Sequence, residues 1–284
     1  MLTAIAKGAA AVPFSDLSVF GDALGAIVGG ALGVRRAHVE ESMARANIAD
    51  PRENARAMYA SLGRSVLEVL WMAGAPRDLR ELVALDASAR RVLSDAKSRG
   101  AVLAASHTGN WEIASCFVAQ TLPLLVVTKH LSVGFVDRFW QASRARYGVT
   151  TIDSRGAFAA ASERVRSGGA VAMMIDQVPN RASHAMALPF LGANAFVDRA
   201  PATVAARTGA LFVVPAARRT ASGAQELVVL DAIAPRKSRE WIDEATARAN
   251  ALLDRFVREN PSQWLWMHRR WKAPSPSRRR PSLA

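Results

Sequence analysis

A histidine and a glutamate separated by four residues are the side chains in this 284-residue sequence best placed for proton transfer. His107 and Glu112 lie in the segment Ala-Ser-His-Thr-Gly-Asn-Trp-Glu, residues 105–112, where an apolar run ends and a helical pattern begins. If the turn folds back, the carboxylate can accept a hydrogen bond from one imidazole nitrogen and leave the other free to take a proton from a hydroxyl. Imidazole has an unperturbed pKa of about 6.5, which suits a base near neutral pH. Alternatively, His107 could simply cap the helix and Glu112 could balance the helix dipole. The pattern alone leaves the catalytic and the structural interpretation open.

Short apolar runs alternate with helical patterns around this pair. We predict strands at 101–106, 124–128, 149–152, 170–175, 211–216 and 226–230, and helices at 52–74, 77–99, 111–120, 136–147, 158–167, 200–208 and 239–259. This alternation predicts an α/β fold with a largely parallel sheet. Such sheets form their sites at the carboxyl ends of the strands, which is where His107 follows its predicted strand.

Other polar side chains follow neighbouring predicted strands. Lys129 comes after the run at 124–128, and Asp176 and Gln177 end the run at 170–175. Because the carboxyl ends of parallel strands share one edge, we expect these three residues to face the same crevice as His107. Lys129 could meet a phosphate of either substrate. Asp176 and Gln177 could position an acceptor or orient a nearby arginine, although a turn cap is the simpler alternative.

Two arginines, Arg144 and Arg146, end the predicted helix at 136–147. A guanidinium offers a fork of donors that fits phosphate, so both are candidate phosphate ligands. A solvated helix face is an equally good explanation.

The composition indicates a folded basic protein. Half the residues are hydrophobic, the formal net charge is +13, and Cys116 is the single cysteine, which excludes a disulfide framework and a cysteine-rich zinc module. The charge favours an anionic partner such as a membrane surface, an acidic protein or a nucleic acid. Arginine supplies most of the cations in an alanine-rich chain, so we attribute part of the charge to genome base composition. The sequence has no RNP-type block or helix-turn-helix signature, and we do not expect it to bind nucleic acid.

Several other chemistries lack their motifs. The sequence contains no Gly-x-Ser-x-Gly, no Gly-x-x-x-x-Gly-Lys, no Gly-x-Gly-x-x-Gly and no His-Glu-x-x-His. Cys116 lies in an apolar helical stretch and is expected to be inert core. We therefore expect neither a metal nor a redox cofactor.

The two ends of the chain differ from its middle. The weakly apolar segment 12–34 is too short and too interrupted by acids to predict a membrane span, and it could be interfacial or a buried glycine-rich helix. Arg35 and Arg36 follow it, as cations at a headgroup layer would. We expect an N-terminal segment at 1–34, a main domain at 35–273 and a disordered basic tail at 274–284. Three tryptophans and several cations at 264–272 suit either a headgroup belt or core packing.

Six separated blocks give the chain a resemblance to a known family. They are Ser-His-Thr-Gly-Asn-Trp-Glu (106–112), Arg-Ala-Arg-Tyr-Gly (144–148), Met-Ile-Asp-Gln (174–177), Leu-Pro-Phe-Leu-Gly (188–192), Pro-Ala-Thr-Val-Ala-Ala-Arg-Thr-Gly-Ala (201–210) and Pro-Ser-Gln-Trp-Leu-Trp-Met-His-Arg-Arg-Trp-Lys (261–272). In this order they resemble the bacterial lipid A biosynthesis acyltransferases, the late lauroyl and myristoyl transferases. The wider group includes mycobacterial phosphatidylinositol mannoside acyltransferases.

The resemblance implies a mixed, mainly parallel sheet flanked by helices, as in glycerolphosphate acyltransferases. It also implies transfer of an acyl chain from a thioester, on acyl carrier protein or coenzyme A, to a hydroxyl of a membrane lipid at the cytoplasmic face of the inner membrane. By the family pattern His107 is the general base and Glu112 its partner, and Asn110, in the same block, is a candidate for substrate binding.

The chain departs from the family pattern in two places. The N-terminal apolar segment is short, and residues 193–199 read Ala-Asn-Ala-Phe-Val-Asp-Arg where small and threonine-rich residues are usual. Arg199, in that block, is a further candidate for acceptor binding. Another acceptor, such as a different glycolipid, an amino-lipid or a secondary metabolite, therefore stays open. So does a non-catalytic basic protein of the membrane surface.

Overall fold

The computed structural model describes residues 1–179 and 182–274. Apart from Pro274, the predicted tail lies outside the described residues. Seven strands form one sheet in the order β1-β9-β8-β2-β5-β3-β4. Each neighbouring pair is parallel except β8 and β9, which are antiparallel. The strands are β1 (Val83–Leu85), β2 (Ala101–Ala105), β3 (Leu124–Thr128), β4 (Val149–Asp153), β5 (Ala170–Met174), β8 (Leu211–Arg219) and β9 (Gln225–Ile233).

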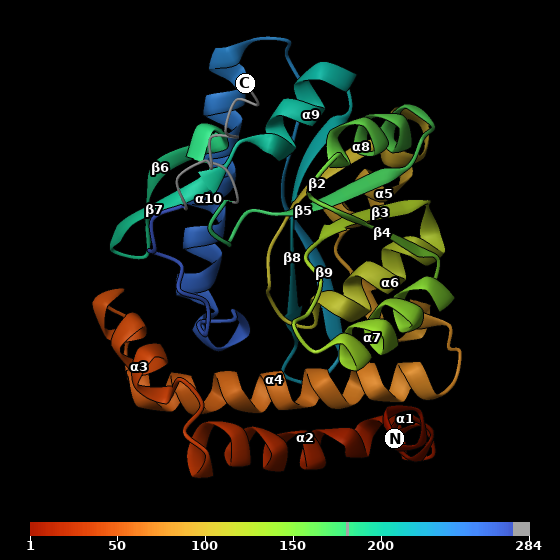
Figure 1. Ribbon diagram of the computed structural model, residues 1–284, viewed down its shortest axis with the longest axis vertical. Helices are drawn as coiled ribbons and strands as arrows, with labels where there is room; N and C mark the ends of the chain where they lie inside the picture. The colour runs from red at the N-terminus through yellow and green to blue at the C-terminus, as the bar shows by residue number, and fades with distance from the viewer. Residues whose placement is uncertain (180–181, 275–284) are drawn as a thin grey trace, which may run out of the picture.

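Helices cover both faces of this sheet (Figure 1). Side chains alternate along each strand, so Val102 and Ala104 enter one hydrophobic core while Leu103 and Ala105 border the other. The first core is closed by α8 (Ala157–Arg166), α9 (Ala200–Thr208) and α10 (Arg239–Glu259), and the second by α5 (Ala87–Arg99) and α6 (Trp111–Thr121). The predicted α/β class with a mixed, mainly parallel sheet flanked by helices is confirmed.

The structure differs from the sequence prediction at one helix and at one hairpin. The single helix expected at 77–99 is in fact β1 followed by α5. The Asp86 side chain accepts a hydrogen bond from the Ala89 backbone N–H and caps α5, so the residues before it are free to pair with β9. The hairpin of β6 (Ala185–Phe190) and β7 (Ala193–Asp198) was not predicted. Leu191 and Gly192 both have positive φ, as a two-residue type I′ turn requires.

Helices α1 (Leu2–Ala10) and α2 (Leu17–Gly25) lie beneath the long helix α4 (Pro51–Gly74) in Figure 1. Helix α2 continues into a π-helical stretch at Ala26–Ala31, and α3 (Arg36–Arg45) stands at one end of α4. A glycine stripe lets α2 approach α4 closely, since a Cβ at Gly25 would lie 2.3 Å from the Tyr59 carbonyl oxygen. The Arg64–Asp22 ion pair, 2.5 Å, joins the same two helices. One face of α2 therefore packs on α4, as the alternative of a buried glycine-rich helix predicts, while Val19 and Phe20 stay exposed.

No single helix among the described residues is long and apolar enough to cross a membrane. The helical stretches Leu2–Ala10 and Phe14–Ala31 meet the length and composition criteria only together, as a pair bent by 115°.

Candidate active site

His107 lies two positions beyond the end of β2. Its partner carboxylate is Asp176, which lies two positions beyond the end of the neighbouring strand β5. The His107 backbone N–H donates to Asp176 Oδ2 at 2.7 Å, and His107 Nδ1 lies 3.0 Å from Asp176 Oδ1. Since Ala105 pairs with Met174, residues two positions beyond each strand end are brought together. Trp264 Nε1 donates to Asp176 Oδ2 at 2.9 Å. Asp176 is fully buried, and burial opposes its ionisation, but His107 and these hydrogen bonds hold its pKa below the usual range.

This geometry corrects the predicted hydrogen bond between His107 and Glu112. The structure places Glu112 in the first turn of α6 against Arg144 of α7 (Gly134–Arg146), with Arg144 Nε 2.8 Å from Glu112 Oε2. The carboxylate also accepts a hydrogen bond from Trp111 Nε1 at 3.1 Å. Burial opposes ionisation of Glu112, but the Arg144 guanidinium outweighs it and lowers the pKa. The ends of parallel strands brought Asp176 to the imidazole, whereas the helix start turned Glu112 toward α7.

A second imidazole, His268, faces His107. The ring centroids are 4.9 Å apart, and the Gln177 side-chain nitrogen lies 3.4 Å from Nε2 of each ring. Burial, together with the neighbouring cationic groups, lowers the pKa of His268 to about 4, so this ring is neutral at pH 7. Sequence reasoning placed His268 only in the aromatic and cationic block at 261–272, because nothing local joins that block to residue 107.

The C-terminal block holds the His107 turn in place. Leu265 N–H donates to the His107 carbonyl at 3.1 Å, and Gly109 N–H donates to the Gln263 carbonyl at 2.7 Å. Gly109 has φ +52°, and a Cβ there would meet the Ala217 carbonyl oxygen at 2.6 Å. Trp264 is buried, so of the two alternatives for this tryptophan, core packing holds and the headgroup belt does not.

Asn110 connects this turn to α4 by a hydrogen bond to Glu68, which forms a buried ion pair with Arg219. Its side-chain oxygen accepts from Ile113 N–H at 3.1 Å and caps α6, while its nitrogen donates to Glu68 Oε2 at 2.7 Å. Arg219 donates to both Glu68 oxygens, at 2.5 and 2.9 Å, and both side chains are buried. Asn110 therefore uses its side chain to hold the turn, which suits positioning better than the substrate contact predicted for it.

Replacing Glu68 by alanine is expected to destabilise the protein by about 3–5 kcal/mol, because it leaves the Arg219 charge buried and unpaired. Glu244→Ala is the matched control, since it removes the acid of the exposed pair Arg236–Glu244 and should change stability by no more than about 0.5 kcal/mol. Urea unfolding of both variants measures the difference. Equal, small losses would show that the buried pair is not needed to hold the turn.

Of the other predicted substrate-binding residues, Lys129 and Arg199 line the groove and Arg146 does not. Lys129 and Arg199 line the same large groove as His107, and Arg199 is tied to Asp243 at 3.3 Å. Arg146 points away, because its guanidinium donates to the Ala73 carbonyl at the end of α4, 2.7 Å away. Cys116 is buried, and burial raises its pKa to about 12, as expected for a core thiol.

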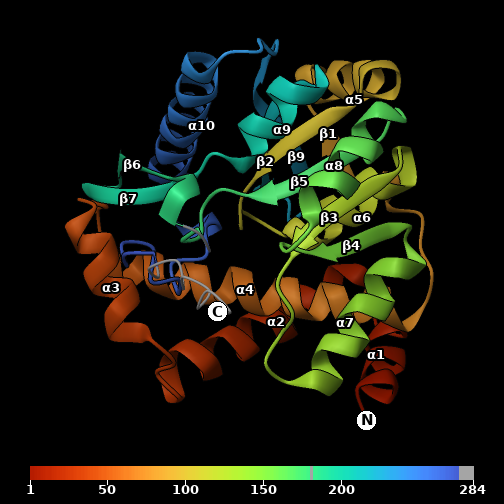
Figure 2. The same cartoon turned by 45° about the horizontal axis from the view of Figure 1, so that its top comes forward.

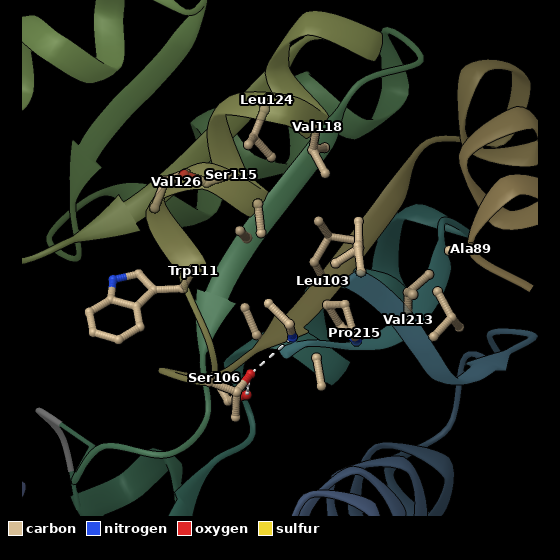
Figure 3. Close-up of a pocket in the computed structure, with 18 of the residues that line it drawn as sticks. Ala89, Leu103, Ser106, Trp111, Ser115, Val118, Leu124, Val126, Val213 and Pro215 are labelled. Carbon is tan, nitrogen blue, oxygen red and sulfur yellow. Dashed lines mark hydrogen bonds between the residues drawn. The ribbon is translucent and has the colours of Figure 1, made fainter. Parts of the chain in front are cut away.

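Two hollows adjoin the site. The groove that exposes His107, Gln177 and His268 has a volume of about 1880 Å³. A cavity of about 90 Å³ lies between the sheet and helices α5 and α6 and is lined mostly by apolar side chains. Figure 3 shows Leu103, Val118 and Val213 around this cavity, with the Trp111 indole turned away from them. Trp111, Glu112 and Arg144 line both hollows, so the Glu112–Arg144 pair stands where they meet.

The ionisable side chains at the site form a histidine–carboxylate pair. Within residues 1–179 and 182–274, no three His, Cys, Asp or Glu side chains are grouped so as to hold a metal ion. The arrangement consists of a histidine with one nitrogen fixed by a buried carboxylate, at the wall of the groove of about 1880 Å³.

Comparison with known proteins assigns the chain to a family. The family described as bacterial lipid A biosynthesis acyltransferase matches residues 1–273. No curated protein matches the chain. Members of this family are acyltransferases of lipopolysaccharide synthesis that typically work at the inner membrane. Because the match covers nearly the whole chain, the protein belongs to the bacterial lipid A biosynthesis acyltransferase family.

Proposed function

We propose that the protein transfers a fatty acyl chain from a thioester to a hydroxyl of a lipid A precursor or a related glycolipid, with His107 as the general base and Asp176 as its partner. The observation that supports this proposal is the orientation of the His107 imidazole. Nδ1 of His107 is held by buried Asp176, and Nε2 lies at the groove wall beside Gln177. With Nδ1 fixed, Nε2 is the nitrogen that can accept a proton from an incoming hydroxyl, once that hydroxyl takes the place of the Gln177 amide beside it.

The reaction needs a single displacement. As the acceptor oxygen attacks the thioester carbonyl carbon, its proton passes to His107 Nε2, and Asp176 stabilises the imidazolium that forms. The tetrahedral intermediate then collapses, the C–S bond breaks, and the imidazolium returns the proton to the thiolate sulfur. Backbone N–H groups at the start of α6 are candidate donors to the oxyanion, since the helix dipole places partial positive charge there. The Glu112–Arg144 pair fixes that helix start against α7.

The two hollows suit the two substrates. The apolar cavity behind Trp111 and Glu112 fits the end of an acyl chain, and the wide groove fits the acceptor and the carrier of the thioester. Lys129 and Arg199 at the groove are available for substrate phosphates. Either acyl carrier protein or coenzyme A would meet a basic surface, because both are anionic. We place the reaction at the cytoplasmic face of the inner membrane.

The direct test is to incubate the purified protein with acyl carrier protein or coenzyme A thioesters and a lipid A precursor, and to analyse the lipids by mass spectrometry. A new acyl ester with release of free thiol supports the proposal. Thioester consumption with a different extracted lipid, but not with the lipid A precursor, would keep the chemistry and replace the acceptor. No acyl transfer to any lipid would refute the function.

Ala114→Phe is expected to shift donor preference toward shorter chains, because Ala114 of α6 lines the narrow cavity. Losing room for two methylenes should lower kcat/KM for the longest donor by about tenfold, at roughly 0.8 kcal/mol per buried methylene. Kinetics with donors of graded length measure the shift. Gln120→Phe, exposed on the same helix, is the control. An unchanged length profile in Ala114→Phe would place the acyl chain elsewhere.

A further inference from the structure

Exposed apolar side chains mark a loop outside the N-terminal segment. In the described part of the chain, the large hydrophobic residues that are left exposed lie at 1–34 and at 131–158. Three of them, Leu131, Val133 and Phe135, lie in the short connection from β3 to α7 and the first turn of α7, which together we call the β3–α7 loop; their exposed fractions are 48%, 48% and 53%. This concentration of apolar side chains over five positions is unusual on a surface facing only water.

The loop is held in shape from beneath. Asp137, in the first turn of α7, accepts a hydrogen bond from Leu131 N–H at 2.9 Å through Oδ1, and its Oδ2 lies 2.7 Å from His130 Nδ1. Asp137 itself is buried. A buried carboxylate that fixes the loop backbone keeps Val133 and Phe135 turned outward, so their exposure is part of the fold.

The loop lies on the same side of the molecule as the N-terminal tips. Figure 2 places the start of α1, the turn between α2 and α3, and the loop entering α7 along its lower edge, and all three are in the lower half of Figure 1. Helix α1 also contacts α7. We call these three segments the apolar edge; their exposed side chains are Met1, Ile5, Leu32, Val34, Leu131, Val133 and Phe135.

Cations flank each part of the apolar edge. Lys7 is exposed on α1, Arg35 follows the turn after α2, and Lys129 and Arg138 are exposed on either side of the loop. Protruding apolar side chains between cations match a bilayer interface, where the apolar groups enter the acyl boundary and the cations meet anionic headgroups. These exposed apolar residues come from three separate segments with cations beside each of them, which suits a lipid surface better than one continuous protein interface.

We propose that the apolar edge is a membrane-contact surface and that the β3–α7 loop inserts Val133 and Phe135 into an anionic lipid surface. Lys129 and Leu131 of this loop also line the groove that exposes His107. Contact at the loop therefore sets the groove mouth against the bilayer, and a lipid acceptor can reach the site without passing through water. Only this last step rests on the proposed function.

The experiment compares vesicle binding of the full chain with that of Val133→Ser/Phe135→Ser. The probes are vesicles of phosphatidylcholine alone and of phosphatidylcholine mixed with phosphatidylglycerol, with partition measured by sedimentation. Removing two exposed hydrophobic side chains should weaken binding to the mixed vesicles at least about tenfold. Phe158→Ser is the hydrophobic control, since Phe158 is exposed to 43% on α8 and lines the groove but is not part of the apolar edge, so this variant should bind vesicles as wild type does. Circular dichroism and thermal melting confirm that the variants fold.

The outcomes separate this proposal from the proposed function. Vesicle binding needs no turnover, so the loop effect can appear even if no acyl transfer is ever found. Where turnover is present, the double variant should lose activity on acceptor embedded in vesicles and keep it on acceptor dispersed in detergent. Equal partition of wild type and double variant, or an equal loss in Phe158→Ser, overturns the proposal. If the double variant binds vesicles normally but loses activity only with carrier-protein donors, the loop binds the carrier protein. That result would also overturn the membrane-contact proposal.

Discussion

His107→Ala is expected to lower kcat by about 10²–10⁴-fold, the range that a positioned general base contributes. The imidazole is the group at the groove wall whose second nitrogen is held by a fully buried carboxylate. Without it, the acceptor hydroxyl must lose its proton to water during attack on the thioester. Steady-state release of free thiol with saturating donor and acceptor measures the loss.

The control for this variant is His184→Ala. His184 is an exposed histidine that lines the outer part of the same groove, so its removal should change kcat by no more than about twofold. Near wild-type turnover in folded His107→Ala would remove the basis of the mechanism, because no base would then be assigned to the hydroxyl.

Asp176→Asn is expected to reduce kcat by a comparable factor, about 10²–10⁴, without changing the shape of the site. An asparagine can turn its amide nitrogen toward His107 Nδ1 and so favour the tautomer with the proton on Nε2, the nitrogen that must accept the hydroxyl proton. The same substitution in the Ser-His-Asp triad of serine proteases costs about 10⁴ in kcat for this reason. Kinetics and the ¹⁵N chemical shifts of the His107 ring measure rate and tautomer together.

Glu112→Gln distinguishes the two carboxylates. The buried Glu112 carboxylate pairs with Arg144, so removing its charge should lower the free energy of unfolding and leave the His107 tautomer unchanged. If Glu112→Gln, and not Asp176→Asn, moved the ring shifts, the pairing seen in the structure would not be the one that operates in solution.

The Asp176 substitution also has a stability signature in pH. The pKa of Asp176 is lower in the folded protein than the value of about 3.9 for an unfolded aspartate. Its ionised form therefore contributes stability that is fully present above about pH 4 and is lost as the pH falls further. Urea unfolding of Asp176→Asn should lack that part of the acid dependence.

Local pattern was sufficient for much of the fold. The alternation of short apolar runs with amphipathic helices is set by neighbours along the chain, and it predicted α6, α9, α10 and the central strands within a few residues. The hairpin β6–β7 escaped prediction because its two strands are stabilised by each other and by a turn whose Leu191 has an uncommon positive φ. Strand β1 escaped because only pairing with β9 makes it a strand.

The sequence by itself determined that His107 stands at a strand end before a helix, and that Asp176 follows another strand facing the same edge. Tertiary structure alone decided which carboxylate reaches the imidazole. Strand order places β5 beside β2 and so brings Asp176 to His107 Nδ1, while the start of α6 turns Glu112 toward Arg144. It also brought His268 from the far end of the chain to face the base. Spacing along the chain constrains only near neighbours, whereas the partners in this site lie 69 and 161 residues from His107 and meet through sheet pairing and packing.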